Sequence, residues 1–96
     1  MIRHTVAFRL RHPAGSTEEV AFLTASLSLA EIPGVQQFEQ LRQVSPKSEF
    51  TFGFSMEFAD DAAYQGYNNH PAHTAYVSDI WLPEVEAFQE IDYTQL

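Results

Sequence analysis

The sequence predicts a single α+β domain of the ferredoxin-like kind, in which two helices cover one face of a four-stranded antiparallel sheet. Three observations lead to this fold class. The chain has 96 residues, which is the size of one domain. Its hydrophobic residues alternate with a period of two in some segments and recur at helical spacing in others. The resulting element order is β-α-β-β-α-β, the order of the split βαβ arrangement.

Residues 2–10 are predicted to form the first strand, because apolar and polar side chains alternate there. Ile2, Val6 and Phe8 share one face of this strand. His4 lies on the same face, so we expect it to point into the layer between the sheet and the helices. A histidine on an apolar strand face is either a hydrogen-bonded core residue or a ligand, and both interpretations stay open.

The first helix is predicted to begin at Ser16, because Ser16 and Glu19 have the spacing of a capping box. Apolar residues follow at helical spacing, and Pro33 then stops the helix. A second strand is predicted over residues 35–44. Its many glutamines indicate an edge strand or a partly solvated one.

The third strand is predicted over residues 50–58, which show the strongest alternation in the chain. Its apolar face should lie beneath the helices, because aromatic side chains at strand spacing usually pack in a core. Some of them are also candidates for lining an apolar pocket. The residues of this face are Phe50, Phe52, Phe54, Met56 and Phe58.

The remaining segments predict a broken helix and a last strand. The aspartate pair at 60–61 is suited to cap a short helix that runs to about Tyr67. A second helical piece is predicted to continue to about Trp81. Pro83 and an acidic turn then lead to a last short strand around residues 88–93.

The segment from Tyr67 to His73 is the most specific motif of the chain. Pro71 favours the first position of a helix, where its missing N–H would have no partner, and it pushes the preceding residue towards an extended backbone. We therefore expect His70 at the helix cap and His73 in the first turn, on the same side. The two imidazoles and the phenol of Tyr67 would then converge, which indicates proton-transfer chemistry.

His73 is a candidate general base. The positive end of the helix dipole and burial both favour its neutral form, which is the form that accepts a proton. Tyr67 is a candidate donor to a developing enolate oxygen. The structural alternatives are a histidine that fixes the loop by a hydrogen bond and a tyrosine at the rim of the cleft. A metal site made of His70, His73 and a carboxylate at 60–61 is a weaker alternative, because the sequence does not specify the third ligand.

The composition restricts the classes of partner. The chain carries 13 acidic and 5 basic residues, and a net charge of −8 repels phosphate backbones and anionic membrane surfaces. The absence of cysteine excludes disulfides and thiolate chemistry. No apolar run is long enough to span a bilayer. The first residues have the pattern of a strand and lack the features of a signal peptide. We expect a cytoplasmic protein that binds neither nucleic acid nor membranes and uses no cofactor.

Several short motifs together resemble the stress-responsive A/B-barrel (Dabb) family over nearly the whole chain. They are the opening strand with its histidine, Ile32-Pro33-Gly34-Val35, Val44-Ser45-Pro46, the phenylalanine-rich third strand, His70-Pro71-Ala72-His73 and the closing Ile91-Asp92-Tyr93. The resemblance implies a ferredoxin-like subunit that pairs through the exposed face of its sheet to form a dimeric α/β barrel. Most members of the family have no established activity.

One plant branch of the family is a cofactor-free polyketide cyclase, which closes an aromatic ring by aldol condensation in the cleft between sheet and helices. The resemblance implies Tyr67 and His73 as a catalytic pair, with His4 and His70 as further cleft residues. Phe52 stands at the third-strand position where the cyclase carries a histidine. We expect Phe52 to line the ligand site, and the loss of that polar group puts the same substrate in doubt.

Three functions follow from the motifs and the resemblance. The one we favour is a Dabb-domain homodimer with a small apolar ligand cleft and no assigned activity. The second is a cofactor-independent lyase, similar to the polyketide cyclase, that acts on a small keto or aromatic compound through Tyr67 and His73. The third, a cofactor-free monooxygenase, is an analogy at the level of the fold.

Overall fold

The computed structural model describes residues 1–96 and contains one antiparallel sheet with the strand order β2-β3-β1-β4. β1 and β3 are the central strands, and β1 also pairs with β4 along nearly its full length. The predicted ferredoxin-like α+β fold is confirmed. The four strands are β1 (Ile2–Leu10), β2 (Gln36–Arg42), β3 (Phe52–Phe58) and β4 (Val85–Tyr93).

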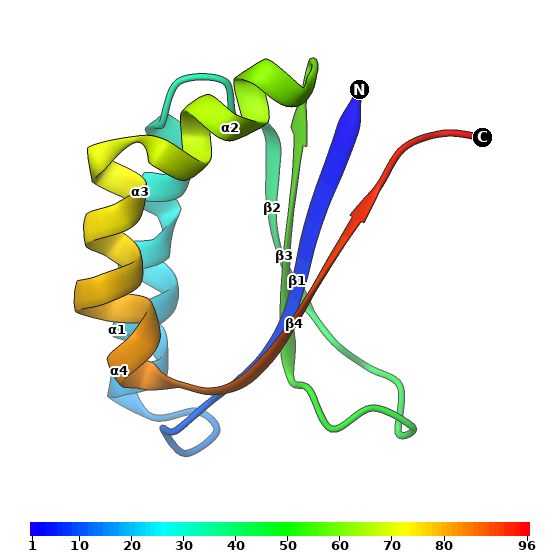
Figure 1. Ribbon diagram of the computed structural model, residues 1–96. Helices are drawn as coiled ribbons and strands as arrows, with labels where there is room; N and C mark the ends of the chain where they lie inside the picture. Colours follow the sequence, from blue (N-terminus) through cyan, green and yellow to red (C-terminus); the bar gives the residue numbers. More distant parts are fainter.

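All the helices lie on one face of this sheet (Figure 1). The segment between β3 and β4 forms a column of helical turns that runs beside α1, and the opposite face of the sheet carries no helix. None of the helices has the length and apolar character needed to cross a membrane. The helical segments are α1 (Thr17–Ser26), a 3₁₀ segment (Leu27–Glu31), α2 (Asp61–Asn69), α3 (Pro71–Tyr76), a π-helical segment (Val77–Trp81) and α4 (Leu82–Glu84).

The helices begin where their capping residues predict. The Ser16 hydroxyl accepts the backbone N–H of Glu19, and the Asp60 carboxylate accepts the N–H of the third residue after it. His70 occupies the cap position of α3, with its Nδ1 3.0 Å from a backbone nitrogen of the first turn, and Pro71 follows at the start of the helix. Each cap satisfies one of the N–H groups that a helix start leaves without a partner.

The core is built mainly from aromatic side chains of β1 and β3. Phe8 and Phe58 have no exposed surface, and Phe54 and Met56 are almost as fully buried. The Phe8 ring lies 4.7 Å from that of Phe54 and 4.9 Å from that of Trp81, measured between centroids. The prediction that the third-strand stripe packs beneath the helices is confirmed for all of its members except Phe50, which precedes the strand.

Three strands have ends that differ from those predicted, and β3 begins at Phe52 instead of residue 50. β4 begins at Val85, three residues before the predicted start, because Pro83 lies within the short helix α4 and the chain turns directly from α4 into the sheet. A proline is tolerated in the first turn of a helix. β2 ends at Arg42, and its pairing with β3 is interrupted near Gln37, whose φ of 52° is left-handed. Strand register and local backbone geometry determine where these strands end. The alternation of apolar residues does not predict these positions.

The face of the sheet opposite the helices is open and carries several exposed apolar side chains. The strand register places Tyr93 opposite Arg3, Ile91 opposite Thr5, and Leu41 opposite Gly53, all pointing away from the helices. Leu41 is 47% exposed, Ile91 41% and Tyr93 53%. This surface, which we call the open sheet face, is flanked by the ion pair between Arg3 and Glu57.

Candidate functional site

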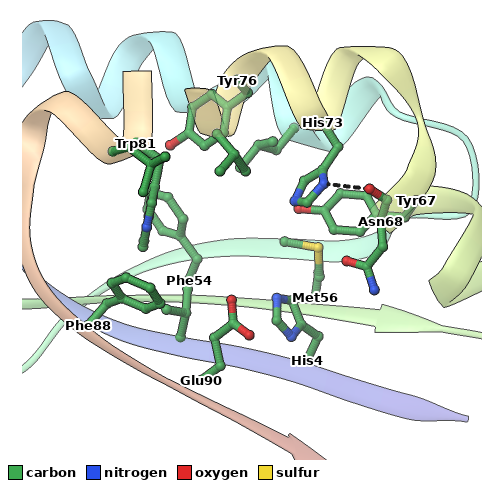
Figure 2. A pocket seen from close by; sticks show the side chains of 14 residues that line it. His4, Phe54, Met56, Tyr67, Asn68, His73, Tyr76, Trp81, Phe88 and Glu90 are labelled. Atoms are coloured by element: carbon green, nitrogen blue, oxygen red, sulfur yellow. Dashed lines mark hydrogen bonds between the residues drawn. The ribbon is translucent and has the colours of Figure 1, made fainter. Parts of the chain in front are cut away.

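A cavity of about 220 Å³ lies between the sheet and the helical column. Ten of its fourteen lining residues are hydrophobic, which is typical of sites for small molecules. Figure 2 shows the strands forming its floor and α2, α3 and the π-helical segment forming its roof. The lining residues are His4, Val6, Leu29, Phe54, Met56, Tyr67, Asn68, His73, Tyr76, Val77, Trp81, Leu82, Phe88 and Glu90.

His4 is buried and is held by two polar side chains from other elements. Its Nδ1 lies 2.6 Å from Oδ1 of Asp92 on β4. The Tyr64 hydroxyl lies 2.9 Å from the same nitrogen and donates to Oδ2 of Asp92 over 2.9 Å. Because a carboxylate only accepts hydrogen bonds, Nδ1 must carry the proton of the neutral ring. The unprotonated Nε2 then points towards the cavity (Figure 2).

The Tyr64 hydroxyl stays protonated. Burial, followed by its hydrogen bond to the Asp92 carboxylate, raises the pKa of Tyr64 well above its ordinary value. The phenol is therefore a permanent donor to Asp92. His4, Tyr64 and Asp92 form a closed hydrogen-bonded triangle that ties together β1, α2 and β4.

His73 lies at the start of α3, with its ring against that of Tyr67 at a centroid distance of 4.3 Å. Its Nδ1 is 3.1 Å from the backbone oxygen of Asn68, to which it donates. The neutral ring therefore leaves Nε2 as an acceptor. Burial lowers the pKa of His73, and the hydrogen bond to Asn68 opposes this only in part. Neutral imidazole is the favoured form at pH 7.

Tyr67 is almost fully buried, and its hydroxyl points into the cavity (Figure 2). Burial, with smaller contributions from the neighbouring Tyr76 and Tyr64, raises the pKa of Tyr67. The group is thus a neutral phenol that can donate a hydrogen bond. Tyr67 and His73 have the chemical character of a donor and an acceptor placed side by side.

Tyr76 lines the cavity but directs its hydroxyl elsewhere. Its oxygen lies 2.6 Å from the hydroxyl of Ser26, which donates its own proton to the carbonyl of Phe22. The tyrosine must then be the donor to Ser26. Burial raises the pKa of Tyr76 to about 12, so this bond between α3 and α1 persists over the physiological pH range.

The structure brings His4, Tyr67 and His73 together and places two other predicted site residues outside the cavity lining. His70 uses its ring to cap α3. Phe52 is buried against Phe8 at a ring distance of 5.7 Å, and the Arg42 guanidinium lies 5.2 Å from the centroid of the Phe52 ring. Phe52 has the predicted inward orientation, but it lies at the opposite end of β3 from His4.

Sequence reasoning missed Tyr64, Asp92 and Glu90. Asp92 belongs to a quoted motif, but its role depends on the pairing of β4 with β1, which places it opposite His4. Tyr64 lies three residues before Tyr67, so helical spacing gives a signal that both rings share one face of α2. Glu90 and Asp92 alternate along β4 with the cavity-lining Phe88. All three residues fall within the predicted strand 88–93, but two acidic side chains beside one aromatic do not show the apolar alternation that marks a strand face turned towards a core.

No group of three or more histidine, cysteine, aspartate or glutamate side chains lies in a position to hold a metal ion. His70 and His73 therefore have no carboxylate to complete a site between them. Elsewhere, His12 lies 2.7 Å from Glu84 and connects the loop after β1 to α4.

A family model described as the Stress Responsive A/B Barrel Domain matches residues 2–95 of this chain. No curated protein shows a significant match. A Dabb family protein with a ferredoxin-like fold from Mesorhizobium loti MAFF303099 has a crystal structure that is 60% identical in sequence, with a TM-score of 0.97. The match covers 99% of this chain and 96% of that one.

Two more distant structures share the fold. A dimeric protein of unknown function from Bacteroides fragilis NCTC 9343 is 21% identical, with a TM-score of 0.73 over 98% of this chain and 95% of that one. A hydroxynitrile lyase from Passiflora edulis is 15% identical, with a TM-score of 0.86 over 99% of this chain and 93% of that one.

The triangle of His4, Tyr64 and Asp92 is expected to stabilise the fold as a unit. Asp92→Ala leaves two buried donors without their acceptor, which costs about 1–3 kcal/mol of unfolding free energy. Tyr64→Phe should cost less. The double variant should lose less than the sum, because both changes remove one shared network. Urea unfolding measures all three, with the exposed Asp79→Ala as control at about ±0.5 kcal/mol. Strict additivity would contradict the triangle.

His73 is expected to make stability depend on pH. Its pKa in the folded protein is below the ordinary value of 6.5, so the unfolded chain binds more protons in the interval between the two values. The unfolding free energy should therefore fall as the pH is lowered from 6.5 towards the folded-state pKa, and be fully present above 6.5. Thermal unfolding across this range measures the decline. The decline in unfolding free energy should be smaller in His73→Asn than in the wild type. Parallel declines in the two proteins would refute the claim that His73 causes the pH dependence.

Proposed function

The chain belongs to the stress-responsive A/B-barrel (Dabb) family, and from this premise we propose that it is a ligand-binding protein whose cavity takes a small molecule with an apolar body and one polar group. Family membership assigns no activity to it. The observation that carries the proposal is the cavity itself, an apolar space of about 220 Å³ whose polar groups gather at one end.

The shape and chemistry of the cavity define the ligand class. Aromatic and aliphatic side chains, among them Phe54 and Phe88, line most of the walls. They would hold a ring or a short chain of the ligand by removing its apolar surface from water. At the other end, His4 and His73 offer acceptor nitrogens and Tyr67 offers a donor. A hydroxyl or carbonyl group on the ligand would find partners there, which fixes its orientation.

Binding is testable without knowledge of the natural ligand. We expect 2-phenylethanol to shift the backbone amide resonances of cavity residues in a two-dimensional NMR titration. Val77→Trp places a larger side chain at the half-buried wall of the cavity and should weaken binding at least severalfold. Val20→Trp, on the exposed side of α1, serves as the matched control and should bind as the wild type does. Equal binding by the Val77→Trp protein, or no shifts in the cavity, would contradict the proposal.

A second candidate function is proton transfer of the lyase type, favoured by the pairing of His73 with Tyr67. A neutral imidazole can take a proton from a carbon or oxygen acid, and a neutral phenol can stabilise the developing oxyanion. The hydroxynitrile lyase from Passiflora edulis has this fold, so the fold is compatible with such chemistry. Exchange of the α-protons of a bound ketone with deuterated water would reveal the activity. This exchange should disappear in His73→Ala, and exchange that persists in the variant would refute the proton-transfer function.

We also propose that the chain forms a homodimer through the open sheet face. Exposed Leu41, Ile91 and Tyr93 support this, because apolar side chains gathered on one unpartnered sheet face are typical of an interface. The related Bacteroides fragilis protein is dimeric. The proposed interface lies on the far side of the sheet from the cavity, so each subunit would keep its own ligand site.

Light scattering during gel filtration should give twice the chain mass of 10.9 kDa at micromolar concentration. Ile91→Asp puts a charge into the proposed interface, where an unpaired buried charge is strongly disfavoured, and should give a monomer. Val20→Asp carries the same charge on α1 and should stay dimeric. A monomeric wild type, or a dimer that Ile91→Asp leaves intact, would contradict this interface.

A further inference from the structure

The cavity contains one carboxylate and no cationic side chain among its lining residues. We propose that it selects a small organic cation, an ammonium group on an aromatic or aliphatic body, over the corresponding carboxylate, and that Glu90 sets this preference. The inference rests on the proposed function, because it presupposes that the cavity binds a small ligand. It goes further by naming the charge of that ligand and the residue that recognises this charge.

Glu90 is placed towards the cavity by the register of β4. It pairs with Val6, while Phe88 pairs with Phe8 and Asp92 with His4, so all three β4 residues share the helix-facing side of the sheet. Figure 2 shows the Glu90 carboxylate beside the cavity, between Phe88 and His4. It has no hydrogen-bond or ion-pair partner within the chain, in contrast to Asp92 and Glu86 on the same strand. Glu90 is exposed, so its negative charge is available to a ligand on the solvent-facing side of the cavity.

No positive side chain neutralises this carboxylate. Arg3 and Arg9 alternate with the inward residues of β1, so they lie on the opposite face of the sheet, where they pair with Glu57 and Glu86. Arg42 lies over Phe52, outside the cavity. An anionic ligand would meet Glu90 without a compensating cation, and the net charge of −8 adds to the repulsion.

The imidazole of His73 does not replace the missing cation, and any charge on the His4 ring is compensated by the Asp92 carboxylate 2.6 Å away. Burial lowers the pKa of His73, so at pH 7 its ring offers an acceptor nitrogen and no positive charge. The Nδ1–H of His4 is occupied by Asp92, which leaves Nε2 as an acceptor in the neutral ring. An ammonium group has three N–H donors, and these acceptors complement them.

The aromatic walls favour the same choice of charge. The Trp81 and Phe88 rings meet at a centroid distance of 5.6 Å, edge to face, and the Phe54 ring lies 6.2 Å from that of Trp81. The faces of aromatic rings attract cations and repel anions. A ligand with its ammonium near Glu90 would therefore keep its apolar body against rings that also stabilise its positive charge.

Three probes of similar size and different charge test the proposal at pH 7: 2-phenylethylamine, 2-phenylethanol and 3-phenylpropionate. Dissociation constants come from NMR titration of the wild type, Glu90→Gln and Glu31→Gln. Glu31 is exposed in the 3₁₀ segment after α1 and does not line the cavity, so its variant removes the same charge away from both the cavity and the open sheet face. We expect the amine to bind about tenfold more tightly than the carboxylate. Glu90→Gln should remove most of this ratio, and Glu31→Gln should preserve it.

The outcomes separate this inference from the proposed function. If the alcohol binds in the cavity but the amine binds no more tightly than the carboxylate, the cavity is a ligand site and the charge preference is refuted. The same holds if Glu90→Gln and Glu31→Gln change the ratio equally, because the preference would then come from overall charge. If no probe binds, the proposed function fails and this inference fails with it.

Discussion

The structure depends on covering the apolar face of its two central strands. Phe8 and Phe58 are completely buried there, and each such side chain contributes about 1.5–3 kcal/mol when it leaves water. A chain of 96 residues has few other sources of stability. The helical column covers this face and removes it from water. The cavity is the space that the rigid aromatic side chains leave unfilled between the sheet and the helices. The proposed binding site thus results from the way the core is closed.

His4 is the exception on that apolar face, and much of the site follows from it. A buried imidazole without partners costs about 1–3 kcal/mol, so its position requires Asp92 and Tyr64 to satisfy it. These residues come from β4 and α2, which lie far apart in sequence from β1. The same bonds fix the ring and its tautomer, and a histidine with a fixed Nε2 is already oriented for a ligand. The need to satisfy the buried His4 ring therefore also orients its Nε2 in the cavity.

Local patterns predicted most of the fold, because local forces decide it. Alternation identified the central strands, and the proline at position 71 identified the cap at His70 and the first turn that holds His73. The partners of His4 could not be predicted, since Asp92 is 88 positions away and only the strand register brings it opposite. Phe52 illustrates the same limit. Alternation gives the face on which a side chain lies, but the position of the cavity along the strand depends on how the helices pack.

The tautomers of His4 and His73 are the most direct test of the site, because the proposed ligand site uses both Nε2 atoms as acceptors and the proposed proton transfer uses that of His73. Long-range nitrogen–proton NMR spectra of the imidazoles, recorded at about pH 8 where a free histidine is neutral, distinguish the two ring nitrogens. We expect both rings to carry their proton on Nδ1, where Asp92 and the Asn68 carbonyl accept it. A proton on Nε2 of either ring would contradict it, because that ring would then present a donor to the ligand.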